Sequence, residues 1–135
     1  MAKEARTRAV KRELYKNYLK KAEEFYRGME RSFNAKDWNA CVVNAVHCAI
    51  SSADAMTVFY LGLRHAGERH QDVLGLLQEI DFGPKEIQSK NRQLSSLLLI
   101  KNRAEYEERL MRKSDAENAL KAAERFHDWV KEKLN

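Results

Sequence analysis

The segment RHAGERH, residues 64–70, carries two side chains that suit chemistry on a phosphodiester, Arg64 at its start and His70 at its end. An arginine binds phosphate oxygens through two parallel N–H groups, and a histidine gives or takes a proton near neutral pH. The segment also has the form of a helix end, because Gly67 suits the left-handed cap of a helix. On a helix, six residues would leave the two side chains about 120° apart. We therefore interpret the segment as a helix end, with a ribonuclease pair of Arg64 and His70 as the alternative.

A second set of polar residues lies upstream at helical spacing: Asn44, His47, Ser51 and Asp54 are three, four and three residues apart. On a helix they fall within one sector of about 80°. Such a stripe between apolar flanks can form the wall of a binding pocket, or can make hydrogen bonds across a dimer interface. His47 and Asp54 are seven residues apart, which is a poor geometry for a base and its orienting carboxylate.

A third set lies in IKNRAEYEERL, residues 100–110, where Lys101, Arg103 and Tyr106 bracket one helical turn. Arg103 and Tyr106 share a helix face. The arginine suits bidentate binding of phosphate, and the tyrosine offers a stacking surface or a hydroxyl. The alternative is a salt bridge from Arg103 between helices, with Tyr106 half-buried beside it.

Positive charge is concentrated at the start of the chain. The net charge is +5, but the first 21 residues hold eight Lys or Arg against two Glu, a net charge of +6. The remaining residues therefore sum to −1. Lys11 and Arg12 become candidate phosphate contacts together with Lys101, and residues 1–9 are predicted to form a basic arm. A solvated helix face would explain the same charges.

Several kinds of chemistry find no support in the sequence. The four histidines are scattered, no CxxC or HExxH pair occurs, and no glycine-rich phosphate loop is present, so we predict neither a metal nor a cofactor. Cys41 and Cys48 lie two helical turns, roughly 10 Å, apart, too far for a disulfide. No run of about eighteen apolar residues predicts a membrane span, and the basic start lacks the apolar stretch of a signal peptide. We expect a cytoplasmic protein.

Apolar residues recur at helical spacing along the whole chain, and no alternating pattern predicts a strand. The second helix is apolar on more than half of its circumference, which places it in the middle of a bundle or against a second copy. Asp37 is expected to cap that helix and Ser114, with Glu117, to cap the last one. The predicted helices cover residues 9–33, 37–65, the segment HQDVLGLLQEI, residues 85–111 and residues 114–134. The predicted fold is all-α, a single domain over residues 1–135 built as an antiparallel bundle of four to five helices with a long central second helix.

The segments DWNACVVNAVHCAISSADAMTVFYLG, HQDVLGLLQEI, KNRAEY and SDAENALKAAERFHDWVKEKL, in this order, resemble the HEPN domain family over residues 10–134. The resemblance implies a bundle of four or five helices that dimerises across the face carrying the second helix. Many members are metal-independent endoribonucleases with an Arg-x4-6-His motif late in the chain. Others are inactive and associate with nucleotides, RNA or a minimal nucleotidyltransferase in toxin–antitoxin pairs.

The late motif of the catalytic members is incomplete in this chain. Arg103 and Tyr106 stand in the corresponding region, but no histidine occurs between His70 and His127. By the resemblance, His70 matches the histidine that opens the third helix, where it would cap and pack. We therefore expect a non-catalytic HEPN-like protein that binds a nucleotide, RNA or a nucleotidyltransferase partner and forms a homodimer. A metal-independent endoribonuclease using Arg64 and His70, or His47, is the first alternative. A structural adaptor is the second, although no 34-residue repeat is present.

Overall fold

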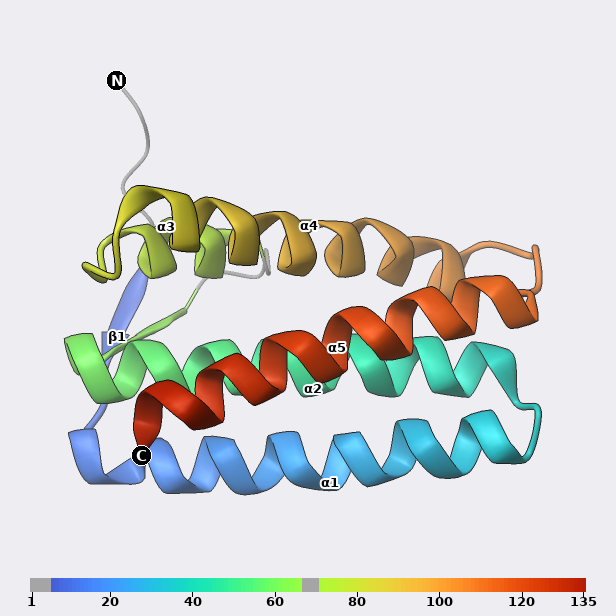
Figure 1. Cartoon of the computed structure of the whole chain (residues 1–135), viewed down its shortest axis with the longest axis horizontal. Coiled ribbons are helices and arrows are strands. Elements are labelled where there is room, and N and C mark those ends of the chain that lie inside the picture. Colours follow the sequence, from blue (N-terminus) through green and yellow to red (C-terminus); the bar gives the residue numbers. More distant parts are fainter. Residues whose placement is uncertain (1–5, 67–70) are drawn as a thin grey trace.

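One helix, α2, runs through the middle of the protein, and the other long helices pack around it (Figure 1). The structure is a computed structural model and describes residues 6–66 and 71–135. In chain order the elements are β1 (Thr7–Ala9), the 3₁₀ helix η1 (Arg12–Leu14), α1 (Tyr15–Asn34), α2 (Trp38–Leu61), β2 (Leu63–His65), α3 (Asp72–Gln78), α4 (Pro84–Tyr106) and α5 (Lys113–Leu134). The prediction of an all-α bundle with a long central second helix is confirmed.

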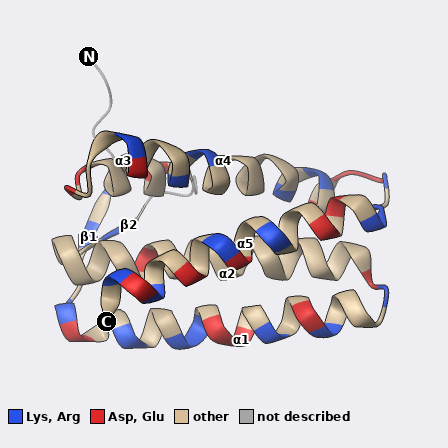
Figure 2. Ribbon diagram, in the orientation of Figure 1, with Lys and Arg blue, Asp and Glu red and all other residues tan. Residues whose placement is uncertain are grey.

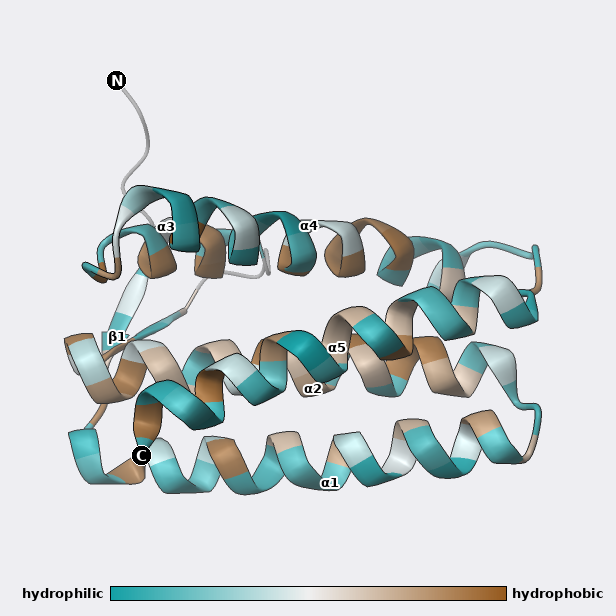
Figure 3. Ribbon diagram, viewed as in Figure 1, coloured by the Kyte–Doolittle hydropathy of each residue, from teal (hydrophilic) through white to brown (hydrophobic). Residues whose placement is uncertain are grey.

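The core forms where the apolar stripes of α1, α4 and α5 meet α2. Colouring by hydropathy shows hydrophobic residues on the side of α4 that faces the other helices (Figure 3). Met29 of α1, Leu94 of α4 and Phe126 of α5 are fully buried there together with most of α2. Each side chain of this size contributes about 1.5–3 kcal/mol when it leaves water, so the core fixes how the four long helices pack.

The first helix begins at Tyr15 and not at residue 9, where the sequence had predicted its start. Residues 7–9 form β1, which pairs antiparallel with β2 so that Thr7 lies opposite His65 and Ala9 opposite Leu63. The expected basic arm is therefore held against the bundle over these residues. The side chains of β1 are all exposed. A strand of three exposed residues leaves no alternating apolar pattern, which is why it was not predicted.

The second helix also ends earlier than predicted, at Leu61 instead of residue 65. Gly62 is its left-handed cap, with φ +67°, and the Gly62 amide donates to the Val58 carbonyl at 3.0 Å. After this cap the chain reverses and forms β2. Arg64 therefore lies on a strand, which removes the helical angle estimated between it and His70. Gly67 and His70 lie outside the described residues.

The boundaries of the last two helices also differ from the prediction. The fourth helix ends at Tyr106 instead of residue 111, and beyond it the Met111 amide donates to the Asn39 side-chain oxygen at 2.7 Å. The last helix begins at Lys113, and the backbone N–H of Arg112 donates to Asp115 at 2.8 Å. The predicted cap of Ser114 with Glu117 is wrong, and the acidic capping partner is Asp115.

Two properties of α2 follow from its central place. The helix is long and apolar enough to span a membrane by composition, but 78% of its most apolar window is buried inside the protein. Cys41 and Cys48 are both buried and free, as predicted. Burial raises the pKa of Cys48 to about 12, which keeps the thiol protonated and unreactive at neutral pH.

The cap of α2 can be tested with a matched pair of glycines. Replacing Gly62 by alanine should lower the free energy of unfolding by about 1–2 kcal/mol, because the left-handed conformation is strained for a residue with a Cβ. Gly75 of α3 has an open surrounding and no positive φ, so Gly75→Ala should raise stability by up to about 1 kcal/mol. Urea unfolding of both variants measures the difference, and equal effects would contradict the cap.

Candidate functional site

A pocket of about 620 Å³ lies where α1, α2 and β2 meet. Three of the four residues in the predicted polar stripe of α2, His47, Ser51 and Asp54, line it, because their spacing places them on one face of the helix. The remaining lining residues come from α1, from α2 and from β2: Tyr18, Lys21, Glu24, Phe25, Ile50 and Arg64. Three residues of the stripe therefore line a cavity, and their role in ligand binding stays a prediction.

Asn44, the fourth residue of the stripe, has a different place. Its side-chain amide donates to the Ser32 hydroxyl of α1 at 3.3 Å. A Cβ built on Gly28 would lie only 3.1 Å from the same amide nitrogen. Gly28 thus lets α1 approach α2 closely at this point. In the structure Asn44 joins the two helices and is not among the residues that line the pocket.

Asp54 is the most deeply placed polar group of the pocket, with 2% of its surface exposed. The Arg64 Nε donates to its Oδ2 at 3.1 Å, and His65 Nε2 lies 3.6 Å from its Oδ1. Burial raises the pKa of Asp54 to about 6, although the neighbouring Arg64 acts in the opposite direction. The pairing of Asp54 with β2 was missed by sequence reasoning, since it depends on where the helix ends.

The Arg64 side chain contacts both Asp54 and Tyr18, and its guanidinium group lines the pocket. Its Nε is bound to Asp54, and its Cζ lies 5.5 Å from the centre of the Tyr18 ring. Within the described chain its two terminal nitrogens make no hydrogen bond. Arg8 of β1 donates to the Tyr18 hydroxyl at 3.2 Å, and Lys21 is exposed at the pocket rim. Arg64 and Lys21 thus lie over the Tyr18 ring, and Arg8 binds its hydroxyl.

Aromatic rings also line the pocket. The rings of Phe25 and His47 stack with their centres 5.3 Å apart and an interplanar angle of 30°. His47 Nε2 lies 3.5 Å from the Glu105 carboxylate, which also binds the Lys101 ammonium at 2.9 Å. Burial acts to raise the pKa of Glu105, but Lys101 and His47 outweigh it, so this pKa is lowered. The Glu105 carboxylate of α4 thus lies next to the Nε2 edge of the His47 ring.

The other predicted site residues are not brought to this pocket. Arg103 and Tyr106 lie in the last turn of α4, are exposed, and line neither large cavity of the described chain. The Lys101 side chain is only 12% exposed and pairs with Glu105. Roles in ligand binding for Arg103 and Tyr106 stay predictions.

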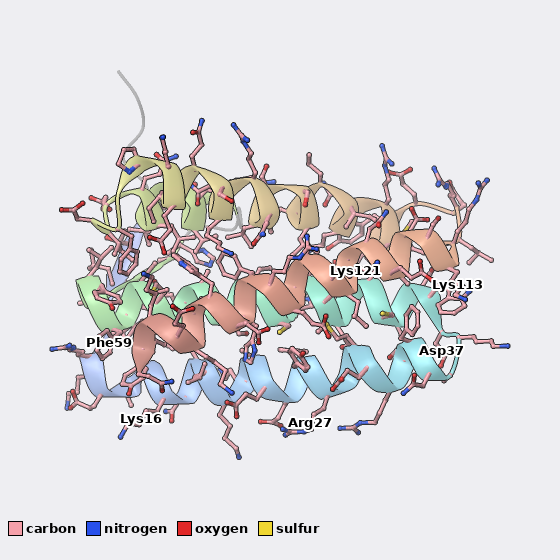
Figure 4. The ribbon with its side chains drawn as sticks, in the orientation of Figure 1. Lys16, Arg27, Asp37, Phe59, Lys113 and Lys121 are labelled. Atoms are coloured by element: carbon pink, nitrogen blue, oxygen red, sulfur yellow. The ribbon has the colours of Figure 1, made fainter. Side chains whose placement is uncertain are left out.

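The segment just before α1, which carries Lys11 and Arg12, lies at the opposite end of the bundle from the end of α4 (Figure 1). Both are exposed, and the Arg12 Cζ lies 4.2 Å from the centre of the Phe59 ring. Phe59 is labelled at that end of α2 in Figure 4. The predicted basic set is therefore divided between two ends, and its common role in phosphate binding stays a prediction.

Charge is distributed unevenly among the helices. Lys, Arg, Asp and Glu are interspersed along α1, α4 and α5, whereas α2 is almost free of them (Figure 2). Asp54 is the one such residue in the sequence of α2. A second cavity of about 720 Å³ lies between α3 and α4 and is lined by none of the predicted site residues. The smaller α1–α2 pocket is the one where cations, aromatic rings and a buried carboxylate meet.

The arrangement suits binding of an anion that carries a flat ring. Within residues 6–66 and 71–135, no group of three or more His, Cys, Asp or Glu side chains is placed to hold a metal ion. An arginine fixed through its Nε can still present its two terminal amino groups to a phosphate. The Phe25–His47 wall offers a stacking surface for a base.

The fold and pocket define a small helical-bundle protein with a polar site on its core helix. Comparison with protein families gives a match to the HEPN domain over residues 15–133. The chain therefore belongs to the HEPN family, as its motifs predicted, and this family is tied to RNA binding or nuclease activity. A search of curated proteins finds no relative.

The burial of Asp54 predicts a definite pH dependence of stability. The pKa of Asp54 is about 6 in the folded protein, above its ordinary value of 3.8. The folded protein thus holds this proton more tightly than the unfolded chain. The stability contribution of Asp54 is full below the ordinary pKa and falls as the pH rises through about 6.

The variant Asp54→Asn should therefore gain stability relative to the wild type as the pH rises from about 4 to about 6, with no further gain above. Urea unfolding of both proteins at a series of pH values measures this difference in the free energy of unfolding. A difference that shrinks with rising pH would show instead that the ion pair with Arg64 outweighs the cost of burial.

Proposed function

We propose that this HEPN protein binds RNA or a nucleotide in the α1–α2 pocket. The observation that carries the proposal is the placement of Arg64, which is fixed by Asp54 and Tyr18 with its terminal amino groups unbonded in the described chain. Bidentate arginine contacts are strong for phosphate, and Lys21 adds a second cation at the rim. The bound group would place its phosphate on Arg64 and Lys21.

The remaining walls suit the other parts of a nucleotide. A volume of about 620 Å³ lies within the range of pockets that hold small molecules. The stacked Phe25 and His47 rings can receive a base, and such stacking contributes about 1–3 kcal/mol per base. Ser51 lies on the same wall and offers a hydroxyl to the ribose or the base.

We further propose that the bound RNA is not cleaved. The catalytic members of the family have a histidine late in the chain, and the next histidine after Arg103 is His127. The His127 side chain is 4% exposed and packs against the Tyr26 ring with centres 5.0 Å apart. This supports a packing role. An endoribonuclease using Arg64 with His70, or His47, is the second candidate, since Arg64 does line the pocket.

The partners and location are also proposals. We propose a homodimer across the α2 face, a minimal nucleotidyltransferase as partner in a toxin–antitoxin type pair, and a cytoplasmic location. Support for the dimer comes from the family resemblance, because members of the family dimerise across the face that carries the second helix. A protein-binding adaptor without a nucleic-acid ligand remains the alternative. Light scattering of the purified protein should give twice the monomer mass, and a monomer at all concentrations would contradict the dimer.

The pocket can be tested with paired variants in an RNA-binding titration at two salt concentrations. Arg64→Ala and Lys21→Ala should each weaken binding about tenfold or more at low salt and reduce the salt dependence by about one phosphate contact. Arg27 and Lys16 of α1 point away from the bundle (Figure 4), so Arg27→Ala and Lys16→Ala are matched controls. These controls should bind nearly as the wild type does.

Charge reversal at Arg103 distinguishes the pocket from the end of α4. Loss of binding in Arg103→Glu, with no loss in Arg64→Ala, would move the site to α4 and contradict the pocket. An assay of RNA cleavage completes the test. Cleavage by the purified wild type that is lost in His70→Ala would establish the endoribonuclease instead.

A further inference from the structure

The main cation of the pocket, Arg64, is bound to the carboxylate of Asp54. Asp54 is nearly fully buried, and one of its oxygens, Oδ2, receives the Arg64 Nε at 3.1 Å. The other oxygen, Oδ1, accepts no hydrogen bond within the described chain. It faces His65 Nε2 at 3.6 Å. Asp54 therefore has one oxygen that orients the arginine and one that is open to a proton.

The charged and titratable groups around Asp54 come from four elements. Arg64 and His65 belong to β2, and Lys21 and Arg8, which also act on its charge, belong to α1 and β1. The pocket adds Glu24 of α1 and His47 of α2 itself. Lys21 and Arg64 line the pocket, and Asp54 lines it as a nearly fully buried group.

We propose that Asp54 is the positioning residue of the Arg64 anion site, and that the site takes up a proton on Asp54 when it binds a phosphodiester. The inference rests on the proposed function and names the regulation of the same pocket. Binding is therefore favoured by mild acid, and the proton is delivered to Oδ1.

The physical reason is competition between two anions for one guanidinium. An ionised Asp54 neutralises Arg64 and repels an arriving phosphate, and a like charge at this distance disfavours ionisation. A protonated Asp54 still offers Oδ2 as an acceptor to Nε, so the guanidinium keeps its orientation while its full charge faces the ligand. Burial already raises the pKa of Asp54 to about 6, so the proton is available close to neutral pH.

Isothermal titration calorimetry with a short oligouridylate that lacks terminal phosphates tests the proposal. This probe keeps a constant charge between about pH 5.5 and about pH 8, so a pH effect belongs to the protein. Titration at about pH 7 in two buffers of different ionisation enthalpy counts the protons taken up. We expect net proton uptake by the wild type and binding about tenfold tighter at the acid end, the effect of one unit of pKa shift.

Variants identify the group that holds the proton. Asp54→Asn keeps the acceptor for Arg64 without the charge, so it should bind at both pH values about as tightly as the acid wild type and take up no proton. His47→Gln should keep the wild-type pH dependence. His65→Gln should also keep it, and loss of proton uptake in His65→Gln but not in Asp54→Asn would overturn the assignment.

A measurement without ligand completes the test. In the NMR spectrum of the free wild type, the Arg64 Nε–H resonance should shift as Asp54 is protonated, and this titration should be absent in Asp54→Asn. An Arg64 resonance that does not move over this range would overturn the positioning role. Equal binding at both pH values without proton uptake would overturn the inference alone. Absence of binding at every pH would overturn the proposed function as well.

Discussion

The burial of α2 is the constraint on which the rest of the structure depends. A helix that is apolar around most of its circumference must be surrounded, and α1, α4 and α5 supply the surfaces that bury it. Polar groups inside such a helix must be satisfied locally or by neighbours. The Ser52 hydroxyl donates to the Cys48 carbonyl at 2.8 Å, and the Thr57 hydroxyl to the Asp54 carbonyl at 3.2 Å. These local bonds let small polar residues sit in the core without a partner from another helix.

Asp54 is a deeply buried polar group of α2 that its own helix does not satisfy. Its carboxylate binds Arg64 and lies 3.6 Å from His65 Nε2, and the chain delivers both residues only after the helix has been capped at Gly62 and has turned back as β2. The pairing of β1 with β2 then brings Arg8 toward Tyr18, beside the same arginine. One buried carboxylate therefore connects the end of the core helix, the small sheet and the α1–α2 pocket. The proposed anion site is a consequence of how a core helix accommodates its single acidic residue.

The chain belongs to the HEPN family, and its fold agrees with that membership. The fold gathers other polar residues than the sequence motifs had favoured. The residues that sequence motifs favoured, Arg103 and Tyr106, are exposed at the end of α4. The residues that the fold gathers lie instead on α1, α2 and β2. Arg64 belongs to both descriptions, first as half of a suspected ribonuclease pair and then as the cation held by Asp54. Arg64 is still a candidate functional residue, but its partner in the described structure is the Asp54 carboxylate of the core helix.

The sequence by itself determined the bundle, because helical periodicity and the apolar circumference of α2 are local properties of the chain. It also identified His47, Ser51 and Asp54 as one polar face, since their spacing alone places them together. Only the tertiary structure decided what lies opposite that face. The early cap at Gly62, the exposed strand of residues 7–9 and the approach of Arg64 to Asp54 carry no periodic signal. They depend on contacts between distant residues, and such contacts are decided by how buried surfaces and buried charges are satisfied in three dimensions.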